Sequence, residues 1–302
     1  MNFLNPTTDI AFKKLFGNAQ HADILISFLN SILKRKPGEE IVDVVFNNPN
    51  YVPNLPDDKA VIIDVLCTDQ MGKKYVIEMQ AARQNFFLER AQFYIALMLA
   101  NQLKSGEEYT KLRPVIFVAI LDFDLLEKND YVSHYTMRET ETNAQDPQLL
   151  ELHIVELPKF IKTVEELTND ADRWIYLLKN AEDLHAVPAQ FKTNTVMRDA
   201  FDILERGSWN RDEMFFYHAM VKQARDERGR LSTMHAEGRK EGLEEGRTEG
   251  REEGLKEGIE QGKKEMAIIL AKQLLKNKTL TTKEISDITK LTLDEIEALK
   301  KK

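Results

Sequence analysis

The sequence predicts an α/β domain in which helices flank a mixed β-sheet, followed by an all-α tail. Short apolar runs at residues 60–67, 74–80 and 114–121 have the length and β-branched content of strands, and helical patterns lie between them. The run at 114–121 is apolar throughout, which is typical of a central strand covered on both faces. Seven glycines at four-residue spacing, from Gly238 to Gly262, mark a charged tail of different composition.

The elements of the domain are expected in the order α-α-β-β-β-α-β. Cap-type residues at 7–9 precede a helical pattern at 10–17. The remaining elements follow in chain order: a helix at 21–33, a strand at 41–46, the strands at 60–67 and 74–80, a helix at 86–103, the strand at 114–121, a strand at 152–157 and helices up to about residue 224.

The second and third strands are predicted to form one antiparallel hairpin, because the segment between them is short and contains Gly72. A three-residue loop with this glycine in the left-handed position pairs Asp69 with Lys73. Counting back along both strands then places Asp64 opposite Glu78.

Two carboxylates within apolar strands need a positive partner. Directly opposed residues share a face, and side chains alternate along a strand, so Asp64, Glu78 and Gln80 point to the same side. Mg²⁺ is typically held by one or two carboxylates with waters and substrate phosphate oxygens, and it would remove the repulsion. The alternative is that the two carboxylates are half-exposed and paired with nearby lysines, Lys59, Lys73 or Lys74.

Composition indicates one sizeable core domain with a smaller appendage, since 302 residues with 42% hydrophobic content can bury such a core. The N-terminus lacks a signal-peptide pattern, and no apolar run has the length of a membrane span, so we expect a cytoplasmic protein without a membrane partner. A net charge of −8 argues against bulk electrostatic coating of DNA. Any contact with nucleic acid must therefore be local.

Cysteine and histidine usage disfavours zinc chemistry. Cys67 is the single cysteine, and its offset from Asp64 places it on the opposite face of the strand, in the core. The six histidines include no pair at the i, i+3 or i, i+4 spacing by which a helix presents two metal ligands.

Four stretches together resemble a known family. They are TDIAFKKLFG at residues 8–17, IEMQ at 77–80, ERAQFY at 89–94 and ELPKF at 156–160. The α-β-β-β-α-β order, with Asp on the second strand and Glu-x-Gln on the third, is similar to the core of the PD-(D/E)XK (restriction-endonuclease-like) nucleases. More narrowly, the four stretches resemble the Rpn family of recombination-promoting nucleases and transposase-like proteins, over about residues 1–225.

The resemblance implies a metal-dependent DNA endonuclease linked to DNA recombination or mobile elements. It carries over Asp64 and Glu78 as ligands of Mg²⁺, with Mn²⁺ as a substitute, and DNA as the partner. Gln80 stands where the wider superfamily has Lys, and an amide cannot carry positive charge or shuttle a proton. Lys13, Arg83 and Arg90 are candidates to supply the missing cation.

Three further side chains are accessory candidates. Arg90 and Tyr94 are four residues apart on a predicted helix, so they share a face and could meet a phosphate backbone together. The alternative is a solvated Arg beside a core Tyr. Asp9 either approaches the metal from the first helix or simply caps that helix.

The tail divides into a linker at 226–265 and a small helical module at 266–302. Each Gly in a helix costs about 0.8 to 1 kcal/mol relative to Ala, so the repeat predicts either a flexible linker or a helix whose glycine stripe packs closely, as in a homodimer. In the module, an amphipathic helix at 267–275 and capping boxes at 281–284 and 292–295 predict three short helices. These form either a helix-turn-helix-like unit or a protein-interaction module.

Three functional hypotheses remain. The first is the Mg²⁺-dependent endonuclease. The second is a catalytically impaired DNA- or protein-binding member of the same fold, which Gln80 suggests. The third is an RNase-H-like transposase using Asp64, Asp122 and Glu156, although that fold needs its last carboxylate on a helix and residues 152–157 alternate like a strand.

Overall fold

The computed structural model describes residues 2–35, 38–51, 61–144, 148–276 and 280–300. The chain divides into two compact units, Met1–Arg228 and Gly229–Lys302. The sequence had placed the end of the nuclease-like domain at residue 225.

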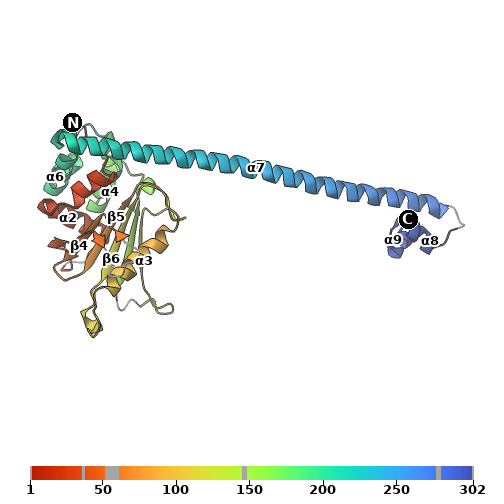
Figure 1. The fold of residues 1–302 in the computed structure, drawn as a ribbon, viewed down its shortest axis with the longest axis horizontal. Helices are drawn as coiled ribbons and strands as arrows, with labels where there is room; N and C mark the ends of the chain where they lie inside the picture. Colours follow the sequence, from red (N-terminus) through yellow and green to blue (C-terminus); the bar gives the residue numbers. More distant parts are fainter. Residues whose placement is uncertain (1, 36–37, 52–60, 145–147, 277–279, 301–302) are drawn as a thin grey trace. The chain divides into compact units, whose positions relative to one another are not determined.

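The first unit is built on a six-stranded mixed sheet in the order β1-β4-β5-β6-β8-β7 (Figure 1). Strands β5, β6 and β8 run parallel, whereas β1, β4 and β7 join their neighbours antiparallel. The bounds are β1 Val44–Phe46, β4 Val65–Asp69, β5 Lys74–Gln80, β6 Val115–Leu121, β7 Val132–Thr136 and β8 Leu150–Glu156. Strands β2 Asn50–Tyr51 and β3 Val61–Ile62 form a separate antiparallel pair.

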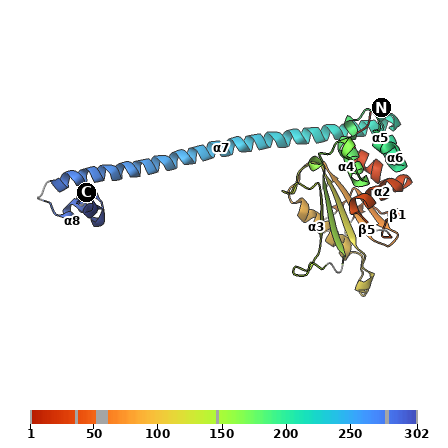
Figure 2. The same ribbon diagram turned by 180° about the vertical axis from the view of Figure 1, so that it is seen from behind.

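Helices cover both faces of this sheet (Figures 1 and 2). On one face pack α1 Asp9–Phe16, α2 Ala22–Leu33, α4 Asp170–Asn180, α5 Ala189–Lys192 and α6 Thr195–Leu204, and on the other packs α3 Phe87–Ala100. Short 3₁₀ turns lie at 19–21, 109–111, 157–159, 164–166, 181–183 and 206–208. Every residue of β6 is buried, which confirms it as a central strand covered on both sides.

The predicted hairpin register is confirmed. Val65 pairs with Ile77, and the same alignment places Asp64, the residue just before β4, opposite Glu78. At the other end the Asp69 N–H donates to the Lys73 carbonyl at 2.9 Å, and Gly72 has the expected positive φ of 80°. The loop therefore sets which side chains meet across the two strands.

Several expected elements differ from the structure. The strand at 41–46 begins only at Val44, and the helix at 86–103 spans Phe87–Ala100. Strand β7 was not expected, because its sequence VSHYT is polar. The segment gains its strand geometry by pairing with β8 at the sheet edge. The separate helix at 267–275 is wrong, since those residues form the end of α7 Arg211–Lys276.

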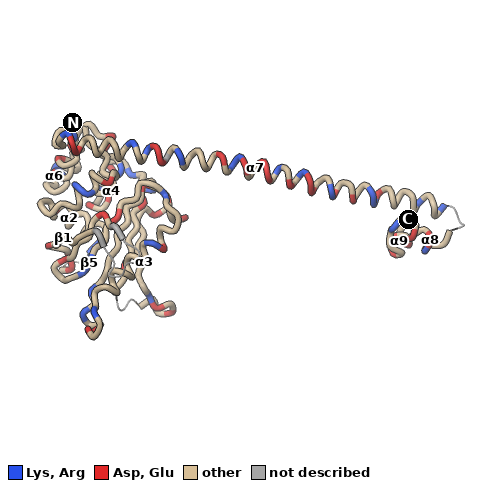
Figure 3. Tube along the Cα trace, in the orientation of Figure 1, with Lys and Arg blue, Asp and Glu red and all other residues tan. Residues whose placement is uncertain are grey.

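Helix α7 continues through all seven glycines of the repeat, so the segment 226–265 is helical in the structure. Acidic and basic residues alternate along its length (Figure 3). The residues between the glycines are mostly Glu, Lys, Arg and Leu, which are good helix formers, and an established helix extends at low cost.

The C-terminal unit ends in a small helical module. Helices α8 Thr282–Thr289 and α9 Leu293–Lys300 close on the end of α7 around a core of Ala271, Ile285, Leu291 and Ile296. Both predicted capping boxes form: Thr281 with Glu284, and Thr292 with Glu295. Among the described residues, no helix combines the length and apolar character that crossing a membrane requires.

Candidate active site

Asp64 and Glu78 lie side by side at the end of the hairpin. The Met79 N–H donates to Asp64 Oδ2 at 2.9 Å, and the Asp64 N–H donates to Glu78 Oε1 at 3.3 Å. Glu78 is only 6% exposed, and the Asp64 side chain is 16% exposed. The backbone of each strand thus holds the carboxylate of the other, and the two groups share one buried position.

This arrangement disfavours ionisation of both groups. Burial raises the pKa of Glu78 to about 8, and the charge of Asp64 adds to the shift. Burial also raises the pKa of Asp64, which the charge of nearby Asp9 raises further, although the Met79 N–H and Lys13 oppose these effects. A positive charge close by would therefore stabilise the ionised forms of these two buried carboxylates.

Helix α1 brings a lysine and a third acid to the pair. Lys13 Nζ lies 2.6 Å from Asp9 Oδ1 and 3.6 Å from Asp64 Oδ1. Burial alone would lower the pKa of Lys13, but Asp9 and Asp64 together raise it. Thr8 occupies the N-cap position, so the expectation that Asp9 merely caps α1 is wrong. Its carboxylate instead contacts Lys13 beside Asp64.

Gln80 and the α3 residues complete the surroundings of Glu78. Gln80 Nε2 donates to Glu78 Oε2 at 3.3 Å. The positive charge of Arg90 lowers the pKa of Glu78, in opposition to burial, and the Arg90 guanidinium also donates to Gln84. Tyr94 is half-buried, and burial together with Glu78 raises its pKa. Hence Arg90 and Tyr94 share the face of α3 that is turned toward the carboxylates.

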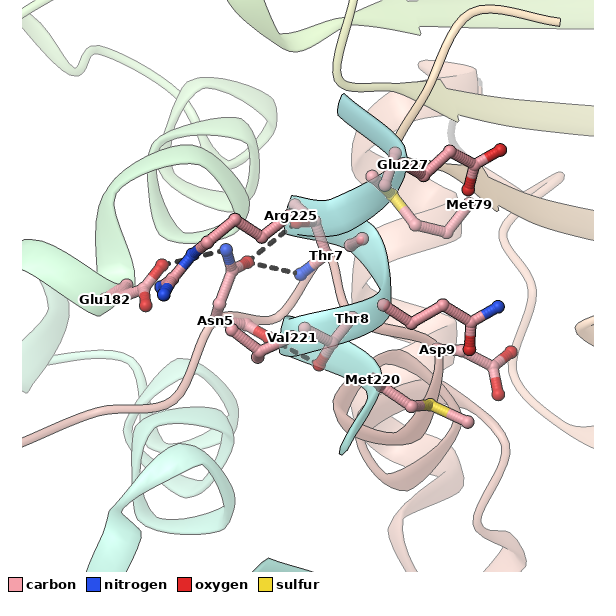
Figure 4. A pocket seen from close by; sticks show the side chains of 13 residues that line it. Asn5, Thr7, Thr8, Asp9, Met79, Glu182, Met220, Val221, Arg225 and Glu227 are labelled. Carbon is pink, nitrogen blue, oxygen red and sulfur yellow. Dashed lines mark hydrogen bonds between the residues drawn. The ribbon is translucent and has the colours of Figure 1, made fainter. Parts of the chain in front are cut away.

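A cleft of about 460 Å³ opens beside these residues (Figure 4). It lies between the start of α1, the end of β5 and the first part of α7, and its lining includes Asp9, Met79, Met220 and Arg225. Asp64 and Glu78 do not line it, although Asp9 and Met79 each contact Asp64 or its partner Lys13. The cleft therefore adjoins residues that contact the carboxylate pair or its partner Lys13.

The α7 wall of the cleft was not anticipated from the sequence. The Asn5 N–H donates to the Tyr217 hydroxyl at 2.9 Å, and Lys14 Nζ lies 2.6 Å from Glu213 Oε1. These contacts join residues about 200 positions apart, and no local spacing marks them. The one usable signal was the apolar character of residues 214–221 ahead of the charged repeat.

In the RNase-H-like alternative, Glu156 would be the third catalytic carboxylate. Glu156 is the last residue of β8, is fully buried, and forms an ion pair with Lys159 at 2.9 Å. Its Oε1 also accepts hydrogen bonds from the Leu125 and Leu126 N–H groups. Glu156 therefore has a structural role at the sheet end and lies on a strand, where that fold requires a helix.

The donor set of the site fits a hard divalent cation. Asp64 and Glu78 offer carboxylate oxygens, and the amide oxygen of Gln80 is adjacent. Oxygen ligands of this kind suit Mg²⁺ or Mn²⁺. A cation would also offset the burial and the like-charge repulsion that raise the pKa of each carboxylate.

A family model described as PD-(D/E)XK nuclease family transposase matches residues 6–234. Comparisons with curated proteins and with solved structures return no match. The matched residues include the whole six-stranded sheet, the carboxylate pair and the α7 wall of the cleft.

Proposed function

Because this chain belongs to the PD-(D/E)XK nuclease family of transposases, we propose that it is a metal-dependent DNA endonuclease that hydrolyses phosphodiester bonds. The observation that carries the proposal is the buried Asp64–Glu78 pair with its raised pKa values. These two residues would hold Mg²⁺, with Mn²⁺ as a substitute, and the accessible face of the site would receive DNA. Its expected setting is DNA recombination or the movement of mobile elements in the cytoplasm.

The chemistry expected of the site follows from its residues. A bound Mg²⁺ would polarise a phosphate oxygen and lower the pKa of a coordinated water. Lys13 places an ammonium group 3.6 Å from Asp64, where it would supply the positive charge that Gln80 lacks. Gln80 donates to Glu78 and so orients that carboxylate. Arg90 and Tyr94 would contact the phosphate backbone from α3.

Plasmid cleavage tests this proposal. Wild-type protein is assayed with Mg²⁺, with Mn²⁺ and with EDTA, beside Asp64→Ala and Glu78→Gln. Glu89→Gln serves as the matched control, because Glu89 is an exposed carboxylate on α3. We expect metal-dependent cleavage by the wild type and by Glu89→Gln, and its loss in both site variants. Equal cleavage by folded Asp64→Ala or Glu78→Gln would refute the assignment.

The second candidate is a binding protein that retains the fold and has lost turnover. The observation in its favour is Gln80, which cannot carry the charge of a lysine. Fluorescence anisotropy with labelled DNA separates the two readings. Tight binding without cleavage of supercoiled, linear or single-stranded DNA, in either metal, would favour this candidate over the endonuclease.

We also propose that α7 mediates homodimerisation. The glycines from Gly238 to Gly262 form a stripe at which an added Cβ would meet no atom within 4 Å beyond the adjoining backbone of its own helix, so another helix could approach closely. Leu243, Leu255 and Ile259 are exposed on the same helix. Sedimentation velocity should show a dimer that Gly250→Gln with Gly254→Gln dissociates, because glutamine favours a helix but blocks close approach. A monomeric wild type at high concentration would refute this.

A further inference from the structure

Two histidines and a glutamate meet on the sheet, away from the carboxylate pair. His134 of edge strand β7 is directly opposite His153 of β8, and Glu151 precedes His153 by two residues, so all three share one face. The imidazole rings stack with centroids 4.1 Å apart and an interplanar angle of 13°. Strand pairing thus brings together two histidines whose spacing in the sequence gives no sign that they are neighbours.

The ligand atoms of these residues converge. Glu151 Oε2 lies 3.3 Å from His153 Nε2 and 3.8 Å from His134 Nε2, and one ligand atom from each residue lies within 4.8 Å of the others. Metal–ligand bonds of about 2.0 to 2.2 Å in tetrahedral geometry separate neighbouring ligands by roughly 3.3 to 3.6 Å. Because the lone pair of an imidazole nitrogen lies in the ring plane, the two stacked rings would have to tilt toward each other to enclose one ion.

Burial differs across the cluster in a way that suits an open metal site. Glu151 and His153 are 7% and 3% exposed, whereas the His134 side chain is 43% exposed. Two ligands are thus held rigidly by the sheet, and the third faces solvent, where a water could complete the coordination. Two histidines with one glutamate form a known ligand set for zinc with an open position.

Glu151 lies among three groups that interact with its carboxylate: His134, His153 and Arg35. The competing explanation is a metal-free cluster in which Arg35 and the histidines neutralise Glu151.

This cluster and the side chain of Glu78 lie on opposite faces of the sheet. His153 aligns with Val118 of β6 and Ile77 of β5, which is the residue before Glu78. Adjacent residues of a strand point to opposite faces, so Glu78 faces α3 while His153 faces the other helical layer. Each site can consequently be tested without the other.

We propose that His134, Glu151 and His153 bind a divalent ion of the zinc type, which fastens the edge strand β7 to β8. Imidazole nitrogens select Zn²⁺ and its neighbours Co²⁺ and Ni²⁺ over Mg²⁺, which prefers oxygen. This site would therefore be occupied by a different metal from the one proposed for Asp64 and Glu78.

Cobalt titration of the full chain tests the site. The protein is stripped of metal and carries no polyhistidine tag, because such a tag binds the same ions. Co²⁺ is added in excess Mg²⁺, and visible absorption reports imidazole ligation in a four- or five-coordinate site. Zn²⁺ is then added to displace it. The variants are His134→Ala, the milder His134→Gln, and His185→Ala as an exposed histidine control.

We expect one Co²⁺ per chain, displaced by Zn²⁺, in the wild type and His185→Ala, and loss of the absorption bands in both His134 variants. The double variant Asp64→Ala, Glu78→Gln should keep the bands. Absence of bands in the wild type, or unchanged bands in folded His134→Ala, would overturn the proposal in favour of the metal-free cluster. Loss of the bands in the double variant alone would overturn it by assigning the ion to the carboxylate pair.

Discussion

Replacing Glu78 by Gln should stabilise the metal-free protein at alkaline pH while removing its response to Mg²⁺. In the native state Glu78 is buried beside Asp64, and its ionised form is therefore disfavoured. Glutamine has the same shape and no charge. Its amide oxygen can still accept the hydrogen bond from the Asp64 N–H, and Gln80 can turn its amide to complement the new NH₂ group.

The size of this gain in stability, and the pH range over which it develops, follow from the pKa of Glu78. A rise from 4.5 to about 8 corresponds to an upper bound of about 5 kcal/mol, at 1.36 kcal/mol per pKa unit. Between these values the native state binds the proton that the unfolded state has lost, so stability falls as pH rises through the window. Side-chain relaxation and water entry reduce the effect, and we expect the variant to gain roughly 1 to 3 kcal/mol near pH 9 and little near pH 5.

Tryptophan fluorescence during thermal unfolding measures this gain in stability. The signal reports on the first structural unit, because the chain's two tryptophans, Trp174 and Trp209, both lie there. At about 2 to 4 °C per kcal/mol, the expected increase in Tm near pH 9 in EDTA is roughly 2 to 12 °C. Adding Mg²⁺ should raise the Tm of the wild type and of the Glu89→Gln control, and it should leave Glu78→Gln nearly unchanged.

The comparison between variant and wild type isolates position 78 together with its partner Asp64, since titrating groups that do not interact with position 78 contribute equally to both. A Glu78→Gln protein that is less stable than the wild type near pH 9 in EDTA would refute the reasoning about buried repulsion. An equal rise in Tm with Mg²⁺ in both proteins would show that the cation binds elsewhere.

Three other changes have defined outcomes. Lys13→Ala should lower the rate of DNA cleavage about 10²- to 10³-fold by removing the ammonium beside Asp64, and Lys13→Arg should restore part of that rate. Unchanged cleavage rates would exclude a role for Lys13 in cleavage. Asp172→Ala should cost about 3 kcal/mol in urea unfolding, because it leaves Lys162 and its other donors without their buried acceptor, whereas a loss below 1 kcal/mol would contradict this. At a concentration low enough to keep the chain monomeric, Gly254→Ala should stabilise α7 by about 0.8 to 1 kcal/mol, read as greater helicity on heating, since its position is open in a single chain; lower helicity of the monomer would contradict this.

Local chemistry made the hairpin and its carboxylates predictable. The three-residue loop with Gly72 sets the register, and the two-residue period of a strand then assigns each side chain to a face. Asp64, Glu78 and the buried Cys67 follow from these rules alone. The helical caps at Thr281 and Thr292 were equally predictable, because each depends on residues three positions apart.

The glycine repeat shows where local propensity is insufficient. The cost of about 0.8 to 1 kcal/mol per glycine argued for a flexible segment, yet α7 is continuous. Its two ends are held in separate cores, through Tyr217 in the first unit and Ala271 in the second. Packing at both ends of α7, together with the helix formers between the glycines, offsets the unfavourable helix propensity of the glycines.

By itself the sequence determined the α/β class, the hairpin register and the positions of the two carboxylates, because those depend on short-range periodicity and turn geometry. Tertiary structure alone decided that Lys13 meets Asp64, that α7 walls the cleft, and that His134 faces His153. Such pairings join distant segments whose arrangement is set by the summed burial of many apolar side chains, and no local spacing encodes that sum.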